Sequence, residues 1–165
     1  CEFTPQEAAE TGLDRVRFLM SANVGEALKP LSKVASGGEL ARIMLAMKQV
    51  LAQQDGVPTL IFDEVDAGVS GRAAQKVALK LWAVSKGRQV LCVTHLPQIA
   101  AMADAEFTVE KRVEHERTYT SVLHLDGSGR RQELARLIGG SMITETTLAG
   151  AAELLRLADE AKRGI

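Results

Sequence analysis

Two short apolar segments, each ending in polar residues, set the strongest limit on what this chain can fold into. The first, Thr59–Glu64, is an apolar run followed by two acids, and the second, Gln89–His95, ends in a histidine. Between them, residues 70–85 carry apolar side chains at helical spacing. Strand, helix and strand in so short a stretch predict a βαβ unit with a right-handed crossover and parallel strands buried on both faces.

The polar residues at the two strand ends are the candidate catalytic residues. Parallel strands end at one edge of a sheet, where α/β proteins bind ligands, so Asp63, Glu64 and His95 are expected to lie together. Asp63 is a candidate Mg²⁺ ligand, through water, because Mg²⁺ keeps much of its hydration. Glu64 would orient or deprotonate an attacking water, and His95 would contact a phosphate. Alone, an acidic pair is more often a solvated strand end and a histidine more often a structural residue.

A glycine pair opens the helix that precedes the first strand. Ser36–Glu39 reads Ser-Gly-Gly-Glu and leads into an amphipathic helix with these residues on one stripe: Leu40, Ile43, Met44, Met47, Val50 and Leu51. The free amides and the dipole of such a helix start form an anion-binding site. The structural alternative is a capping box between Ser36 and Glu39. A capping box does not require Gly37 and Gly38. Two residues without Cβ instead permit close approach of the backbone to a phosphate.

The rest of the sequence predicts one domain, residues 1–165, of the α/β class. Residues 14–22 alternate like a half-buried edge or hairpin strand, and residues 26–35 are typical of a loop. After the second core strand we expect a short helix at 97–103 and a terminal β-hairpin formed by 106–113 and 117–125. A breaker at 126–129 and two closing helices, at 131–138 and 144–162, should follow.

The charge balance argues against an autonomous nucleic-acid binder. The chain has 20 basic and 21 acidic residues, a formal charge of −1, and so lacks the basic excess that marks many such proteins. Any DNA contact is therefore local or lies elsewhere. The candidates are Arg130-Arg131 and Lys111-Arg112, for which solvated charge is the favoured interpretation.

Cysteine usage and hydropathy favour a soluble, cytoplasmic protein. Cys92 lies in an apolar run and is typical of a small buried hydrophobe in a reducing compartment. The three histidines lack zinc-site spacing, and no segment approaches the roughly 20 apolar residues that span a bilayer. Because the chain begins with Cys1, we expect it to be a segment of a longer polypeptide.

Four motifs, in this order and spacing, resemble the ABC ATPase superfamily. They are Val34–Leu40 for its signature motif, Thr59–Glu64 for its Walker B strand, Val65–Gly71 for its D-loop and Val93–His95 for its switch histidine. Four longer stretches are similar to the RecN family of SMC-like bacterial DNA-repair ATPases, namely Lys33–Leu40, Phe62–Gly71, Val93–Ala100 and Leu134–Gly140. The resemblance implies the C-terminal lobe of an ABC/SMC-type P-loop NTPase head.

One expected motif is absent from the sequence. A Walker A loop requires Gly-Lys-[Ser/Thr], and none of the 14 glycines is followed by lysine. The resemblance implies that this loop lies in an N-terminal half of the head, beyond a long coiled coil. We therefore expect this segment alone to be inactive as an ATPase.

The resemblance also implies how the site is assembled. Two heads would sandwich two ATP molecules with Mg²⁺, engage when ATP binds and separate after hydrolysis. Ser36, Gly37, Gly38 and Glu39, with Gly68 and Ser70 of the D-loop, would contact nucleotide, the signature residues acting on the nucleotide of the opposite head. Asp63, Glu64 and His95 would act in their own head. The implied partners are the N-terminal half of the head, a second copy and DNA, with no membrane, at the nucleoid in the cytoplasm.

Two other functions remain open at this point. The nucleotide-binding domain of an ABC transporter shares the motifs, although Val65 stands where transporters usually carry proline. A scaffold lobe with a degenerate site would need no catalytic carboxylate, so the presence of Glu64 argues against it.

Overall fold

The chain forms a mixed α/β structure built around a short parallel sheet. The computed structural model describes residues 1–21, 25–34, 36–51, 54, 56–114 and 117–164. In chain order the elements are β1 (Glu2–Ala9), β2 (Gly12–Arg17), β3 (Leu19–Met20), β4 (Lys29–Pro30), α1 (Leu31–Val34), α2 (Gly37–Val50), β5 (Thr59–Phe62), α3 (Gly71–Ser85), β6 (Gln89–Cys92), α4 (Pro97–Ala100), β7 (Phe107–Glu114), β8 (Arg117–His124), α5 (Gly127–Gly139) and α6 (Glu145–Arg163).

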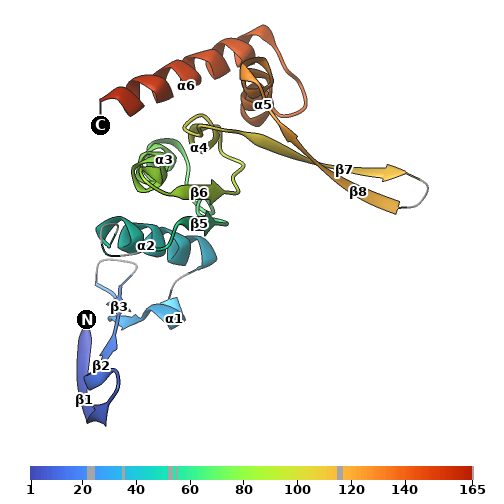
Figure 1. Ribbon diagram of the computed structural model, residues 1–165. Coiled ribbons are helices and arrows are strands. Elements are labelled where there is room, and N and C mark those ends of the chain that lie inside the picture. Colours follow the sequence, from blue (N-terminus) through green and yellow to red (C-terminus); the bar gives the residue numbers. More distant parts are fainter. Residues whose placement is uncertain (22–24, 35, 52–53, 55, 115–116, 165) are drawn as a thin grey trace.

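The predicted βαβ unit lies at the centre of the molecule (Figure 1). β5 pairs with β6 in parallel, with Leu60 opposite Val90, and α3 connects the two strands. Ala74, Ala78 and Leu81 are buried on α3, as the helical spacing predicted. The helix packs on α2 and α4, so the predicted order of strand, helix and parallel strand is confirmed.

The sheet is buried on one face rather than on both. Leu60 and Phe62 point into the core, whereas Ile61 between them is 71% exposed. Leu91, opposite Ile61 in the register, is also exposed. The prediction of burial on both faces was wrong for this chain, because no described element covers the face that carries Ile61 and Leu91.

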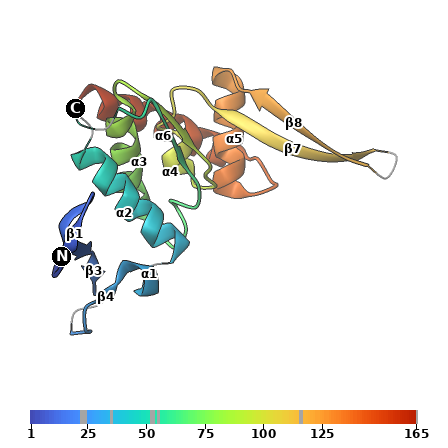
Figure 2. The same ribbon diagram turned by 60° about the horizontal axis from the view of Figure 1, so that its bottom comes forward.

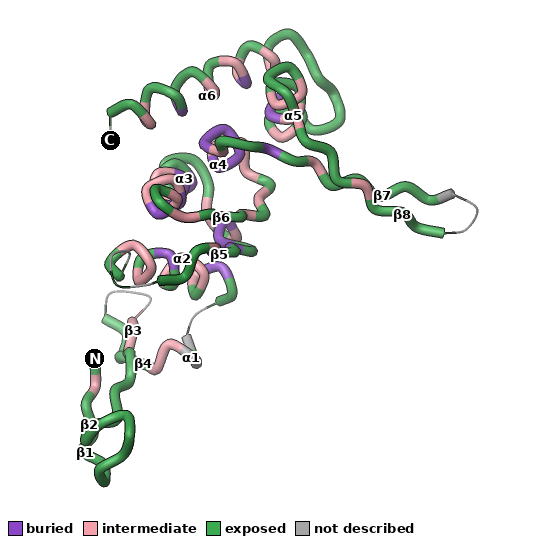
Figure 3. The backbone as a smooth tube through the Cα atoms, viewed as in Figure 1, coloured by how far each residue is buried: buried purple, intermediate pink, exposed green. Residues whose placement is uncertain are grey.

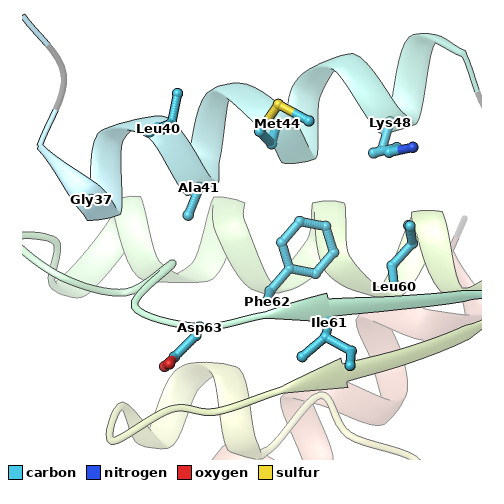
Figure 4. A pocket seen from close by; sticks show the side chains of 9 residues that line it. All are labelled: Gly37, Leu40, Ala41, Met44, Lys48, Leu60, Ile61, Phe62 and Asp63. Carbon is cyan, nitrogen blue, oxygen red and sulfur yellow. The ribbon is translucent and has the colours of Figure 1, made fainter. Parts of the chain in front are cut away.

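Helix α2 forms as predicted but turns a different side to the core. Its buried residues are Gly38 and Leu45, and it packs on α3. Leu40 and Met44, from the predicted apolar stripe, are exposed. Figure 4 shows Ala41 directed toward β5 while Leu40 points away from it. An amphipathic stripe normally marks the core side; here part of it stays uncovered by the described chain.

The N-terminal region differs most from expectation. The hairpin of β1 and β2 extends away from the body (Figure 1), and Figure 2 shows it turned toward the viewer. β1 gave no sequence signal because nearly all of its residues are exposed. The predicted strand 14–22 is divided between β2 and β3, and β4 and α1 lie in the expected loop.

The C-terminal region follows the prediction closely. β7 and β8 form an antiparallel hairpin, and α5 and α6 pack against each other. The 126–129 segment is a helix start rather than a simple breaker, because Asp126 caps α5 by accepting the Gly129 amide at 2.7 Å. Figure 3 places the buried residues around β5, α3, α4 and α5. None of the described helices combines the length and apolar character needed to cross a bilayer.

Candidate nucleotide site

The strand ends bring the three predicted catalytic residues to one edge of the sheet. The amide of Val93 donates to the carbonyl of Phe62 at 3.0 Å, so β5 and β6 end side by side. Asp63 and Glu64 follow β5 directly and are exposed. His95 lies just beyond β6, with its side chain 74% exposed. The three residues therefore follow adjacent strand ends at one edge of the sheet, as expected, and their catalytic roles stay predictions.

Glu64 adopts an unusual backbone conformation. Its φ of +55° lies in the left-handed region, where no other described non-glycine residue is found, and which costs a residue with a Cβ roughly 1–2 kcal/mol. The Asp63 carboxylate accepts the Glu64 amide at 2.9 Å, and the Glu64 carbonyl accepts the Ala67 amide at 2.9 Å. These bonds hold a tight turn immediately after the acidic pair. Strain of this kind is often found at functional sites.

The start of α2 carries the capping box that the sequence left as an alternative. Ser36 Oγ accepts the Glu39 amide at 3.3 Å, and Glu39 Oε2 accepts the Ser36 amide at 2.9 Å. Both side chains are engaged in the cap. In the described part of the chain the amides of Gly37 and Gly38 have no acceptor, as an anion-binding helix start requires.

The two glycines are required for different reasons. A Cβ on Gly38, which is buried, would lie 2.8 Å from the Ala67 Cβ and 2.9 Å from the Glu64 carbonyl oxygen. Close packing therefore explains Gly38 without any phosphate. Gly37 is exposed, and a Cβ there would meet only Glu64 Oε2, at 2.8 Å. The sequence analysis explained both glycines by close approach of the backbone to a phosphate. For Gly37 this explanation stays a prediction.

The segment 65–71 contains the other two predicted nucleotide residues. Gly68 is exposed with a φ of +72°, and Ser70 is exposed at the N-cap of α3 without a side-chain cap bond. Both face solvent on the loop that follows Glu64, and their contacts with nucleotide stay predictions.

Asp66 is a site residue that sequence reasoning missed. It is 3% exposed, and its Oδ2 accepts the Thr94 hydroxyl at 2.6 Å and the His95 amide at 3.0 Å. Burial by itself raises the pKa of this carboxyl, but the hydrogen bonds from Thr94 and His95 outweigh it and hold the pKa below its ordinary value. The only sequence signal was an acid inside the D-loop-like segment, which does not identify a partner.

Arg42 is a second residue that was missed. From α2 it donates to the carbonyl of Val65 at 3.2 Å and to that of Ala67 at 2.7 Å. These bonds tie the segment around Asp66 to the helix that begins at Gly37. The sequence could not show this, because Arg42 looks like any polar residue on an exposed helix side.

An apolar groove of about 370 Å³ runs between α2 and β5 (Figure 4). Its lining includes Leu40, Met44 and Phe62, with Asp63 at one end and Lys48 at the other. Because most of the lining is apolar, the groove suits a packed protein segment better than a phosphate, and Asp63 belongs to its rim.

The candidate metal ligand at this edge is the carboxylate of Asp63. Among the described residues, no three His, Cys, Asp or Glu side chains are grouped closely enough to hold a metal ion. Mg²⁺ is commonly held by one or two carboxylates with phosphate oxygens and water, so the exposed Asp63 fits that ion. Burial, with Asp66 and Asp63 nearby, raises the pKa of the Cys92 thiol to about 12, so Cys92 stays protonated and is no thiolate ligand.

The arginines proposed as DNA contacts are engaged within the fold. Arg130 is mostly buried, lies 3.2 Å from Glu106 Oε2 and donates to the Ala103 carbonyl at 2.8 Å. Arg131 donates to the Leu148 carbonyl at 3.1 Å. The interpretation of Arg130 as solvated charge was wrong, because it compensates the buried Glu106.

Comparison with known proteins places this site in a family. The chain is 51% identical to the DNA repair protein RecN of Bacillus subtilis (strain 168) over 158 residues, 96% of the chain. It is 50% identical to the RecN of Treponema pallidum (strain Nichols) over 159 residues and to that of Deinococcus radiodurans over 149 residues. The chain belongs to the RecN family. It corresponds to a C-terminal part and spans only about a quarter of these relatives, 27% in the Bacillus subtilis protein.

A structural comparison supports the head fold. A solved structure from a study of ATP-driven dimerization and DNA-stimulated activation of SMC ATPases aligns with a TM-score of 0.51. The alignment covers 72% of this chain and 70% of that one, at 24% identity. The expected fold, the C-terminal lobe of an SMC-type head, is thus confirmed, whereas no family model matches the chain.

Proposed function

We propose that this chain is the C-terminal lobe of an ATP-hydrolysing head in a RecN-family protein of DNA double-strand-break repair and recombination. The observation that carries the proposal is the meeting of Asp63, Glu64 and His95 at one sheet edge, beside the start of α2. The RecN relatives are DNA repair proteins, which favours this function over a transporter domain.

Each residue of the edge has a proposed role toward ATP and Mg²⁺. Asp63 would hold the ion through water, and the ion would neutralise charge on the phosphates. A Glu64 carboxylate oxygen would accept a proton from the attacking water, a role worth about 10²–10⁴-fold in rate. His95 would contact the γ-phosphate. The exposed positions of Asp63 and Glu64 suit groups that must reach a ligand.

The phosphate cradle would come from the N-terminal half of the same head. No Gly-Lys-[Ser/Thr] sequence exists in the chain, so the 165-residue segment alone should show no ATPase above background. Mg²⁺-dependent turnover by the segment would reveal another phosphate cradle and contradict the proposal.

The start of α2 would act on the nucleotide of a second copy. The amides of Gly37 and Gly38, together with Ser36, would bind the γ-phosphate of the opposite head, with Glu39, Gly68 and Ser70 nearby. ATP would thereby join two heads, and loss of the γ-phosphate would release them. The solved SMC ATPase that shares this fold comes from work on ATP-driven dimerization and DNA-stimulated activation, which supports self-association and a DNA partner. We place the full-length protein at the nucleoid in the bacterial cytoplasm.

Glu64→Gln in the full-length protein tests this function. We expect ATP binding to persist, turnover to fall by at least about 10²-fold and ATP-bound head dimers to accumulate in sedimentation. Glu7→Gln, an exposed acid-to-amide change on β1, is the matched control. Wild-type turnover in Glu64→Gln would remove Glu64 from the proposed role as the base.

A further inference from the structure

Asp66 is a buried charge whose contacts converge on the residues just beyond β6. Its Oδ2 accepts the Thr94 hydroxyl and the His95 amide, and the same oxygen lies 3.2 Å from His95 Nδ1. A carboxylate that is 3% exposed is retained at a substantial desolvation cost. Here that cost is offset by contacts to two residues, one of them the candidate phosphate contact.

The carboxylate of Asp66 is ionised at neutral pH. Burial works against this, but the hydrogen bonds from Thr94 and His95 keep its pKa below the ordinary value. A negative charge beside Nδ1 favours the ring tautomer that carries its proton on that nitrogen. The other ring nitrogen, Nε2, then carries a lone pair and accepts a hydrogen bond, and the ring is largely exposed.

Asp66 is itself held from both sides. Arg42 of α2 bonds the carbonyls of Val65 and Ala67, which flank it. On the other side, the Thr94 hydroxyl accepts the Leu96 amide at 3.1 Å while donating to Asp66. A continuous set of hydrogen bonds therefore runs from α2, through the 65–67 segment, to the loop that carries His95.

We propose that Asp66 is a positioning residue that fixes the backbone and the ring of His95, with the proton on Nδ1 and Nε2 presented at the sheet edge. Its effect on turnover rests on the proposed function, in which His95 contacts the γ-phosphate. The Nε2 lone pair would meet a phosphate oxygen through a water molecule that donates to both. The effect of Asp66 on the ring does not rest on that function, because the contact exists without nucleotide. The two parts can therefore be tested separately.

Nitrogen-15 spectra of histidine-labelled full-length protein, recorded without nucleotide, test the effect on the ring. His95→Ala identifies the His95 signals. We expect the neutral ring to carry its proton on Nδ1 in the wild type and to lose that preference in Asp66→Ala. Asp66→Asn, which keeps the size and an acceptor but not the charge, should give an intermediate result and covers the case in which Asp66→Ala does not fold. An unchanged tautomer in both variants would overturn the proposal.

Turnover measured as a double-mutant cycle tests the effect on activity. Asp66→Asn should lower kcat by about tenfold or more, as removal of an orienting carboxylate does elsewhere, and change KM far less. In the His95→Ala background the same change should alter kcat by less than about twofold. An equal loss in both backgrounds, or no loss in either, would overturn the proposal for turnover. Wild-type turnover in His95→Ala would instead refute the proposed role of His95 and leave the spectra to decide the positioning.

A matched control separates positioning from general loss of stability. Glu106→Gln removes the other buried carboxylate among the described residues, which pairs with Arg130 and is not bonded to His95. We expect it to lower stability without changing the His95 tautomer. If Glu106→Gln shifts the tautomer as Asp66→Asn does, the Asp66 effect is not specific and the proposal fails.

Discussion

Gly38 and Ala67 pack so closely that a Cβ atom on Gly38 would lie 2.8 Å from the Ala67 Cβ. Real Cβ atoms do not approach so near, because the repulsion at that distance forces one of the two backbones to move. The pair joins the first turn of α2 to the loop after Glu64. A shift of the start of α2 would therefore displace the loop that follows Asp63 and Glu64.

A comparison of Gly38→Ala with Gly37→Ala tests this packing. Gly38→Ala should lower the free energy of unfolding by about 1–3 kcal/mol, the usual cost of overpacking. Gly37→Ala should cost little stability, since its Cβ meets only the movable Glu64 Oε2, but it should reduce turnover by displacing that carboxylate. Urea unfolding and ATPase assays measure the two effects, and equal stability of the two variants would contradict the packing argument.

The left-handed backbone of Glu64 predicts that glycine is tolerated at this position better than alanine. Glycine adopts a φ of +55° without a Cβ clash, whereas alanine does not. Glu64→Gly should therefore unfold with a free energy about 1 kcal/mol higher than Glu64→Ala. Both should lack turnover. Calorimetry on the two purified variants gives the difference, and a more stable Glu64→Ala would show that the turn does not need the left-handed conformation.

Two buried carboxylates should give opposite pH dependences. The lowered pKa of Asp66 means that its stabilisation is complete above about pH 3.8, its ordinary value, and is lost as the pH falls below it. Burial raises the pKa of Glu106, against the pull of Arg130, so its contribution is complete below about pH 4.5 and is lost as the pH rises through the raised pKa.

Urea unfolding followed by Trp82 fluorescence measures this difference. The difference in the free energy of unfolding between the wild type and Asp66→Asn should disappear between about pH 4 and pH 2. Its stability relative to Glu106→Gln should instead decline from about pH 4 toward neutral pH. Parallel pH profiles for the two variants would contradict the assigned directions.

Arg130 should contribute to the stability of the fold rather than to DNA binding. Arg130→Ala leaves the buried Glu106 without its counter-charge and should cost about 3–5 kcal/mol. Arg131→Ala removes a single bond to the Leu148 carbonyl and should cost about 1 kcal/mol. If Arg130→Ala instead keeps wild-type stability and weakens DNA binding of the full-length protein, the assignment of Arg130 to the fold is wrong.

The sheet edge that carries the candidate catalytic residues could be predicted because it depends on local rules. Apolar runs that end in Asp63-Glu64 and His95 predict parallel strand ends, and these ends meet whatever surrounds them. The capping box of Ser36 and Glu39 is likewise local, and it is present.

What could not be predicted depends on contacts between distant segments or on parts outside this chain. Asp66 and His95 are 29 residues apart, and no periodicity links an acid in one loop to a ring in another. The exposure of Ile61 and Leu40 reversed two burial expectations, because hydropathy shows that a residue is apolar and not which element covers it. β1 showed no alternation of apolar and polar residues, because nearly all of its residues are exposed and neither side of the strand faces the core.

Mixing two inactive full-length variants tests most directly whether Ser36 and Glu64 act at the same nucleotide from different heads. Ser36→Arg and Glu64→Gln would each be prepared without ATP, mixed in equal amounts and assayed for turnover. If the signature acts in trans, a mixed dimer combines both defects at one nucleotide and leaves the other site intact, so turnover should recover to about a quarter of wild type. If Ser36 and Glu64 serve one nucleotide within the same chain, as the closeness of Gly37 to Glu64 Oε2 would also allow, every site keeps a defect. Absence of recovery, with mixed dimers shown to form, would contradict the account.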